Sequence, residues 1–228
     1  IAVANSSSKH LLQVINDLLD FSRLNAGIME LAEANFDLNE VISVAFANSL
    51  PTAIDKELLL DAYISPNVPT KLIGDSVRLS QVFTNLINNA VKFTEHGKVT
   101  LKANVIHQTN ATAQIEFKIS DTGCGIPHDK QNFIFDAFSQ VDSSNTRRFG
   151  GTGLGLAIVF KIVNFMNGNI SVSSEVDQGT TFTVTLTLQL EPGAKQHSNE
   201  TLLVNKLNWI IFEPDRERQE YLAEKLSR

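Results

Sequence analysis

Two glycine-rich segments constrain the fold of this chain most, because each adjoins a regular element of a different type. Residues 121–127 read Asp-Thr-Gly-Cys-Gly-Ile-Pro and follow a run in which Ile115, Phe117 and Ile119 alternate with polar residues, a pattern typical of a half-buried strand. Residues 150–156 read Gly-Gly-Thr-Gly-Leu-Gly-Leu and lead into apolar spacing typical of a helix. The two segments therefore predict a domain that combines a sheet with helices.

Three polar residues upstream, Asn85, Asn89 and Lys92, are spaced i, i+4 and i+7, so a helix would present them on one face. Amide oxygens ligate the hard Mg²⁺ ion and a lysine supplies charge for phosphate oxygens, so this face suits a metal–nucleotide complex. Spacing alone favours an ordinary solvated face, and the glycine segments reverse that preference. The opposite face is predicted to pack on a sheet and carries Val82, Phe83, Leu86, Ile87 and Ala90.

Asp121 is predicted to lie at the end of its strand, where Gly123 and Gly125 follow. A carboxylate there can meet a flat heterocycle edge-on while the glycine backbone comes close. The alternative is a plain turn in which the aspartate only caps its own backbone.

The second glycine segment precedes a predicted helix, so its backbone N–H groups and the helix dipole can point at phosphate. The polar stretch 143–149 before it does not resemble a strand, unlike the Rossmann pattern. The polar segment between Phe138 and Gly150 is expected to form a mobile lid over the nucleotide. Arg147 and Arg148 lie in that stretch; the alternative is an ordinary pair of surface arginines.

Together with Phe-Asp-Ala-Phe at 135–138 and Asn-Leu-Ile-Asn-Asn at 85–89, these segments resemble the four ordered motifs of the sensor histidine kinases. The ATP-binding domain of that family shares its fold with the ATPase domains of gyrase, Hsp90 and MutL. The resemblance implies an α/β two-layer sandwich, in which a mixed sheet of about five strands carries three helices on one face. It also implies ATP and Mg²⁺ as cofactors.

The resemblance assigns roles to individual residues. It implies that Asp121 accepts the adenine amine, that Asn89 ligates Mg²⁺, and that Lys92 and a lid arginine, Arg148 in preference to Arg147, act on the phosphates. Phe135 and Phe138 are expected to anchor the lid. The expected ATP-binding residues are Asn85, Asn89, Lys92, Asp121, Gly123, Gly125, Ile126, Phe138, Gly151, Thr152, Gly153, Leu154, Gly155, Leu156 and Thr181.

Four regions are expected along the chain: 1–32, the second helix of a dimerisation hairpin; 33–190, the catalytic domain; 191–206, a linker; and 207–228, the start of a receiver-like domain. The helix expected at 1–32 carries an apolar stripe from Leu11 to Leu24 that needs a partner to cover it. One helix is expected to begin after Asp37, a plausible N-cap, and another after Gly74-Asp75, while strands are expected at 56–64, as an edge strand, and at 207–215.

The hairpin's first helix, with the phosphoacceptor histidine, is expected to lie outside this chain, because His10 is followed by Leu-Leu-Gln without an acid or proline. The receiver-like region resembles that of the BarA/GacS group of hybrid kinases. Its strand ends in Glu213-Pro214 in place of two acids, which predicts a degenerate receiver.

Composition limits the partners. A net charge of −6 without a basic stripe argues against nucleic acid, and the lone Cys124 excludes an internal disulfide. No apolar run is long enough to span a bilayer, so we expect a cytoplasmic portion of an inner-membrane sensor that forms a homodimer and works with a receiver domain. Two rival functions are an ATPase, disfavoured because 85–89 contain no glutamate to activate water, and a non-catalytic dimerising relay.

Overall fold

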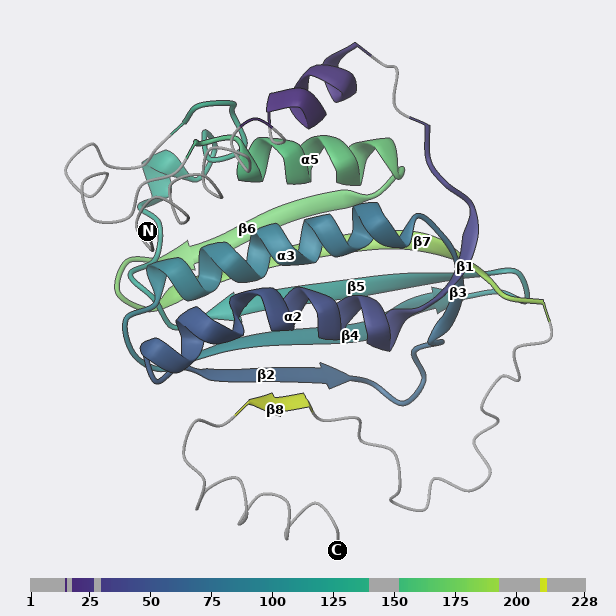
Figure 1. Ribbon diagram of the computed structural model, residues 1–228, viewed down its shortest axis with the longest axis horizontal. Coiled ribbons are helices and arrows are strands. Elements are labelled where there is room, and N and C mark those ends of the chain that lie inside the picture. The colour runs from purple at the N-terminus through teal and green to yellow at the C-terminus, as the bar shows by residue number, and fades with distance from the viewer. Residues whose placement is uncertain (1–14, 16–17, 27–29, 140–151, 193–209, 213–228) are drawn as a thin grey trace, which may run out of the picture.

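The computed structural model describes residues 15, 18–26, 30–139, 152–192 and 210–212. Three helices, α2, α3 and α5, lie on one face of a single sheet (Figure 1). The elements are β1 (Ala34–Asp37), α2 (Leu38–Asp55), β2 (Leu59–Ile64), β3 (Lys71–Gly74), α3 (Ser76–Phe93), β4 (Lys98–Gln108), β5 (Thr112–Asp121), the 3₁₀ turn η1 (His128–Lys130), α5 (Gly155–Phe165), β6 (Asn169–Glu175), β7 (Gly179–Leu190) and β8 (Ile210–Phe212). The predicted two-layer sandwich is confirmed.

The sheet has eight strands in the order β1-β3-β7-β5-β4-β2-β8, with β6 also paired to β7. Among the described strands, β2 and β4 pair in parallel and the other pairs are antiparallel. The expectation of about five strands missed the four-residue strands β1 and β3, because strands this short carry too little alternation to be recognised. The strand β8 lies within the segment 207–215, where a strand was predicted, but it was not expected to belong to this sheet.

Both long helices begin where an aspartate caps them. Oδ1 of Asp37 accepts a hydrogen bond from the N–H of Asn39 at 2.8 Å, and Oδ1 of Asp75 accepts one from the N–H of Arg78 at 2.9 Å. Such a cap stabilises a helix by about 1 kcal/mol. The predicted start of a helix after Asp37, and of another after Asp75, is confirmed.

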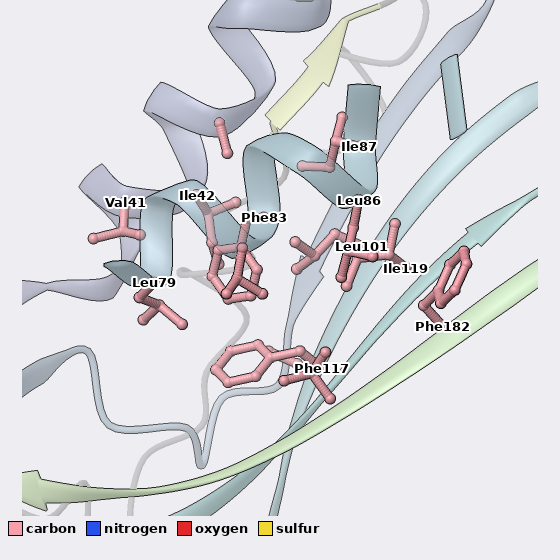
Figure 2. Packing of buried hydrophobic residues seen from close by; sticks show 14 of the residues in the cluster. Val41, Ile42, Leu79, Phe83, Leu86, Ile87, Leu101, Phe117, Ile119 and Phe182 are labelled. Atoms are coloured by element: carbon pink, nitrogen blue, oxygen red, sulfur yellow. The ribbon is translucent and has the colours of Figure 1, made fainter. Parts of the chain in front are cut away.

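The core lies between the helices and the sheet, where Phe83 of α3 packs edge-to-face on Phe117 of β5 with ring centroids 4.9 Å apart (Figure 2). Strand alternation assigns the two faces of the sheet. The buried row Leu101–Ile119–Phe182 lies under the helices, so the neighbouring row Thr100–Ser120–Thr181 belongs to the opposite face.

The strands β2 and β8 differ from expectation in their place in the sheet. The strand expected at 56–64 begins only at Leu59, and it is not an edge strand, because β8 pairs with it in the register Leu60↔Phe212 and Ala62↔Ile210. The strand predicted within 207–215 is therefore present, but it extends the catalytic sheet. The receiver-like assignment of 207–228 stays a prediction.

An N-terminal helical segment, residues 18–25, lies beside α5 and the start of α3 (Figure 1). Oδ2 of Asp20 accepts hydrogen bonds from Arg78 at 3.4 Å and from Gln81 at 2.9 Å, and the Lys161 ammonium lies 5.4 Å from the ring centroid of Phe21. Leu18 and Leu19 are each 51% exposed. Part of the predicted apolar stripe is thus open to solvent, while Phe21 and Leu24 are partly buried against the core. Leu11, Leu12, Val14 and His10 lie outside the described residues.

No helix in the described ranges is both long and apolar enough to cross a membrane.

Candidate functional site

Helix α3 carries the predicted polar face. Asn85, Asn89 and Lys92 are half-buried, whereas the opposite side of the helix is buried against the sheet and consists of Leu79, Val82, Phe83, Leu86, Ile87, Ala90 and Val91. Burial lowers the pKa of Lys92, whose ammonium lies 4.8 Å from the ring centroid of Phe93. Lys92 also lines the cleft between α2 and α3. The prediction that a helix carries these three residues on one face is confirmed. Which ligands they bind stays a prediction.

Asp121 ends β5 on the helix side of the sheet, since it follows Ile119 by two residues. Its Oδ1 accepts hydrogen bonds from the N–H of Gly123 at 2.8 Å and from the N–H of Thr180 at 3.2 Å. Burial raises the pKa of Asp121, and the two backbone N–H groups oppose that rise. The carboxylate is therefore partly desolvated and fixed in direction. The Asx-type bond to Gly123 is the plain turn that the sequence left open, and the bond from Thr180 adds a long-range restraint to it.

The glycines of this first loop serve close packing. A Cβ on Gly123 would overlap the carbonyl oxygen of Phe93 at the end of α3, and one on Gly125 would overlap the carbonyl oxygen of Glu175. Gly125 also has φ of +69°, a conformation that other residues rarely adopt. The sequence predicted these glycines because they allow close approach of a heterocycle. The structure adds a second reason, because the loop packs tightly between the end of α3 and the β6–β7 turn.

Two residues that sequence reasoning missed hold this loop in place. The Oγ of Ser174 in β6 accepts the N–H of Ile126 at 2.8 Å, and the side-chain amide of Gln131 donates to the carbonyls of Ile126 and Ser174, both at 2.9 Å. The alternation from Ile170 through Val172 places Ser174 on the helix side of the sheet, so its face was predictable although its partner was not.

Thr181 requires a correction. It pairs with Ser120 on the face of the sheet opposite the helices, where the two hydroxyls lie 2.9 Å apart. The neighbouring Thr180 lies at Asp121 and its hydroxyl is 2.9 Å from Ser174. Since successive strand residues point to opposite faces, only Thr180 can reach the side that holds α3.

The two phenylalanines of residues 135–138 have different environments. Phe135 packs against Phe160 and Phe182, with centroid distances of 5.4 Å and 6.3 Å, as expected of a core anchor. Phe138 is 64% exposed, has φ of +64°, and contacts Phe21 with centroids 6.4 Å apart. The expectation that both rings anchor the lid to the core is therefore wrong for Phe138.

The second glycine segment leads into α5 as predicted. Helix α5 begins at Gly155, Leu154 is buried, and the hydroxyl of Thr152 accepts the N–H of Leu154 at 3.2 Å. Gly153 has φ of +71°, and its carbonyl accepts the N–H of Phe138 at 3.0 Å. The half-buried Leu156 follows in the first turn. Arg147, Arg148 and Gly151 lie outside the described residues.

The donor set fits a magnesium nucleotide better than a metal held by protein alone. Within the described ranges, no three His, Cys, Asp or Glu side chains gather into a metal cluster. Mg²⁺ keeps several waters and is commonly bound through few protein ligands together with phosphate oxygens, so one or two amide oxygens on this face of α3 would be enough to hold it. The half-buried acceptor at Asp121 suits a base, and the N-terminus of α5 suits phosphates.

Comparison with known proteins agrees with this geometry. The family model described as histidine kinase-, DNA gyrase B- and HSP90-like ATPase matches residues 74–190. The histidine-protein kinase BarA of Escherichia coli K12 is 44% identical over 186 residues, which cover 82% of this chain and 20% of BarA. The sensor histidine kinase RcsC of the same strain is 40% identical over 188 residues, covering 82% of this chain and 19% of RcsC.

Among solved structures, full-length ShkA in complex with AMPPNP superimposes with a TM-score of 0.72 at 34% identity, covering 83% of this chain and 38% of ShkA. The chain spans about a fifth of the length of the curated relatives described above.

Fold and site together define a nucleotide-binding domain in which a helix-covered sheet presents a recessed carboxylate beside a polar helix face. The chain belongs to the family of histidine kinase-, DNA gyrase B- and HSP90-like ATPases, and its ATP-binding domain is similar to that of the histidine kinases BarA and RcsC. The resemblance drawn from the sequence motifs is confirmed.

Proposed function

We propose that the whole protein transfers the γ-phosphoryl group of ATP to a histidine and then to an aspartate of a receiver domain. The observation that carries the proposal is Asp121. Both backbone donors of this partly buried carboxylate go to Oδ1, so its second oxygen is available to an adenine amine on the side of the sheet that holds α3. A base acceptor fixed by the fold, close to amides and a lysine suited to phosphate, is what ATP recognition requires.

The chain's own residues would then position the nucleotide and stabilise charge. Asn89, with Asn85 one turn earlier, would ligate the Mg²⁺ that accompanies ATP and neutralises charge on its phosphates. Lys92 would pair with phosphate oxygens, as would Arg148 or Arg147. The backbone N–H groups of residues 151–156, where α5 begins, would cradle the phosphates, and Thr180 replaces Thr181 as the β7 residue that supports the base acceptor.

Partners follow from the same reasoning. The exposed Ile15, Leu18 and Leu19 of the N-terminal segment fit a helical hairpin that forms a homodimer, since an apolar stripe of this kind needs a second helix to cover it. The phosphoryl acceptor would be a histidine other than His10, because His10 has no adjacent acid to serve as a base. The location of the whole protein would be that of a membrane-bound sensor whose catalytic domain faces the cytoplasm.

Hydrolysis of ATP by water is the less favoured activity. A water-activating glutamate would have to lie on α3 near Asn85 and Asn89, and residues 85–89 contain none.

The test combines binding with labelling. Calorimetric titration of this chain with ATP should show binding that strengthens with Mg²⁺. Incubation with γ-labelled ATP should give no acid-labile label on this chain, whereas the same chain extended upstream through the hairpin should become labelled, and replacing the hairpin histidine should abolish the label. Absence of ATP binding, or labelling of His10, would refute the proposal.

A further inference from the structure

Lys56 makes an unusual set of contacts at the end of α3. It is the C-terminal cap residue of α2, and its ammonium donates hydrogen bonds to the carbonyls of Val91 and Lys92, both at 2.8 Å, and of Thr94 at 2.9 Å. The last carbonyls of a helix have no partner inside that helix. A single side chain from α2 therefore supplies hydrogen-bond donors to three carbonyls at the C-terminal end of α3.

The same short stretch of α3 adjoins the nucleotide side of the molecule. The carbonyl of Phe93 accepts the N–H of Cys124 in the first glycine loop at 3.3 Å, and Gly123 packs directly on that carbonyl. Lys92, whose carbonyl Lys56 binds, belongs to the polar face of the same helix. Between residues 91 and 94, three carbonyls thus go to Lys56 and the fourth goes to the glycine loop.

We propose that Lys56 is a positioning residue of the nucleotide site: its ammonium acts as a built-in cation that fixes the end of α3, and with it Lys92 and the glycine loop. This inference rests on the ATP-binding function proposed above. Lys56 acts through the backbone of α3 and does not itself contact the nucleotide.

Charge is essential to this role. Three acceptors match the three donors of an ammonium, and a cation at a helix C-terminus also interacts favourably with the helix dipole. Burial lowers the pKa of Lys56, which Glu95 partly offsets, so the cation is kept there at a desolvation cost. A group that only filled space would not need that charge.

The cleft beside Lys56 makes the role testable by chemical rescue. A cavity of about 290 Å³ lies between α2 and α3 and is lined by Ser49, Thr52, Lys56, Asn88, Val91 and Lys92. A side chain shortened at position 56 would leave the three carbonyls facing this space. Ammonium or methylammonium is small enough to enter it and to replace the lost donors.

The experiment measures ATP affinity by calorimetry in Lys56→Ala and Lys56→Met. Both variants should bind ATP roughly tenfold more weakly, as expected when charged hydrogen bonds that order the site are lost. Added ammonium should restore affinity in Lys56→Ala, and should do little in Lys56→Met because the retained stem fills the space. Lys118→Met removes a lysine from the opposite face of the sheet and should match the parent, with no response to ammonium.

Parent-like ATP affinity in Lys56→Met, or weakened binding in Lys56→Ala that ammonium does not restore, would overturn the inference. Lys56→Gln is the second variant if the alanine variant unfolds, since it keeps part of the stem and a donor. Hydrogen exchange at the Cys124 amide should be faster in Lys56→Gln than in the parent, and unchanged exchange would also overturn the inference. If the parent itself does not bind ATP, the proposed function fails, and the exchange measurement still decides whether Lys56 orders the loop.

Discussion

The backbone N–H of Thr180 donates to Oδ1 of Asp121 at 3.2 Å, although the two residues are 59 positions apart. The bond joins the end of β5 to the start of β7 and fixes the direction of the carboxylate. Under the proposed function, recognition of the base would therefore depend on the pairing of two strands as well as on the glycine loop that follows Asp121.

Replacing this carboxylate should weaken ATP binding. Asp121→Asn should bind ATP roughly tenfold more weakly, because an amide can present its NH₂ group where an acceptor is needed. GTP, which carries a carbonyl where adenine has its amine, should bind poorly to the parent. Calorimetric titrations with both nucleotides measure this, and equal affinity of the parent for ATP and GTP would contradict the assignment.

The pH dependence of ATP binding should follow the raised pKa of Asp121. The adenine amine needs the ionised carboxylate, so affinity should fall with decreasing pH already above the range in which an ordinary aspartate titrates. Folding stability has the opposite sign: a raised carboxyl pKa favours the folded state at low pH, and this contribution is lost as pH rises through the folded-state value. Asp121→Asn should show a flatter pH profile of ATP affinity than the parent. Because titration of the nucleotide is common to both proteins, the difference between the two profiles reports the carboxylate alone. Identical profiles would contradict a role for this group.

Two glycines give a matched pair of substitutions. Gly125→Ala should destabilise the domain by about 1–3 kcal/mol and impair ATP binding, because Gly125 has positive φ and adjoins the carbonyl of Glu175. Gly155→Ala should fold at least as well as the parent, since a Cβ there meets no protein atom within 4 Å. Chemical denaturation and nucleotide titration check both. A Gly125→Ala protein as stable as Gly155→Ala would show that the loop conformation is not needed.

Thr180 and Thr181 lie on opposite faces of β7, so replacing each of them tests one face of the strand. Thr181→Val should leave ATP affinity unchanged, because Thr181 faces Ser120 on the side opposite the helices. Thr180→Val removes the hydroxyl contact with Ser174 and should weaken ATP binding by loosening the support of Ile126. Affinity measurements on the pair decide the matter, and a loss confined to Thr181→Val would restore the original assignment.

The metal role of α3 is testable at Asn89. Asn89→Ala should reduce the dependence of ATP affinity on Mg²⁺ while leaving thermal unfolding close to that of the parent, because the residue is only half-buried. Titrations with and without Mg²⁺ measure the difference. An unchanged metal dependence in Asn89→Ala would exclude Asn89 as a ligand.

Local patterns in the sequence predicted the local structure well. The alternation of Ile115, Phe117 and Ile119 gave β5, and Asp37 and Asp75 marked the starts of α2 and α3, because strand faces and helix caps depend on neighbouring residues. The same rule applied to β7 would have shown the error at Thr181. Phe182, Val184 and Leu186 face the helices, so Thr181 faces the other side of the sheet, away from the expected nucleotide.

Contacts between segments that are distant in the chain could not be predicted from the sequence. Lys56 meets carbonyls 35 to 38 positions away, and Ser174 meets Ile126 across 48 positions. No spacing rule connects such residues, because their contact depends on how the elements pack. The same holds for β8, whose pairing with β2 could not be inferred from either strand alone.

One hydrogen bond described above, from the N–H of Phe138 to the carbonyl of Gly153, joins two residues that are 15 positions apart in the chain. The entropy of closing such a loop grows slowly with its length, by about 0.6 kcal/mol for each doubling. The segment between the two residues can therefore change in length at small entropic cost while this closing bond is kept. A lid of the kind predicted from the sequence would then be free to diverge in evolution without any change in the sheet and helices that carry Asp121.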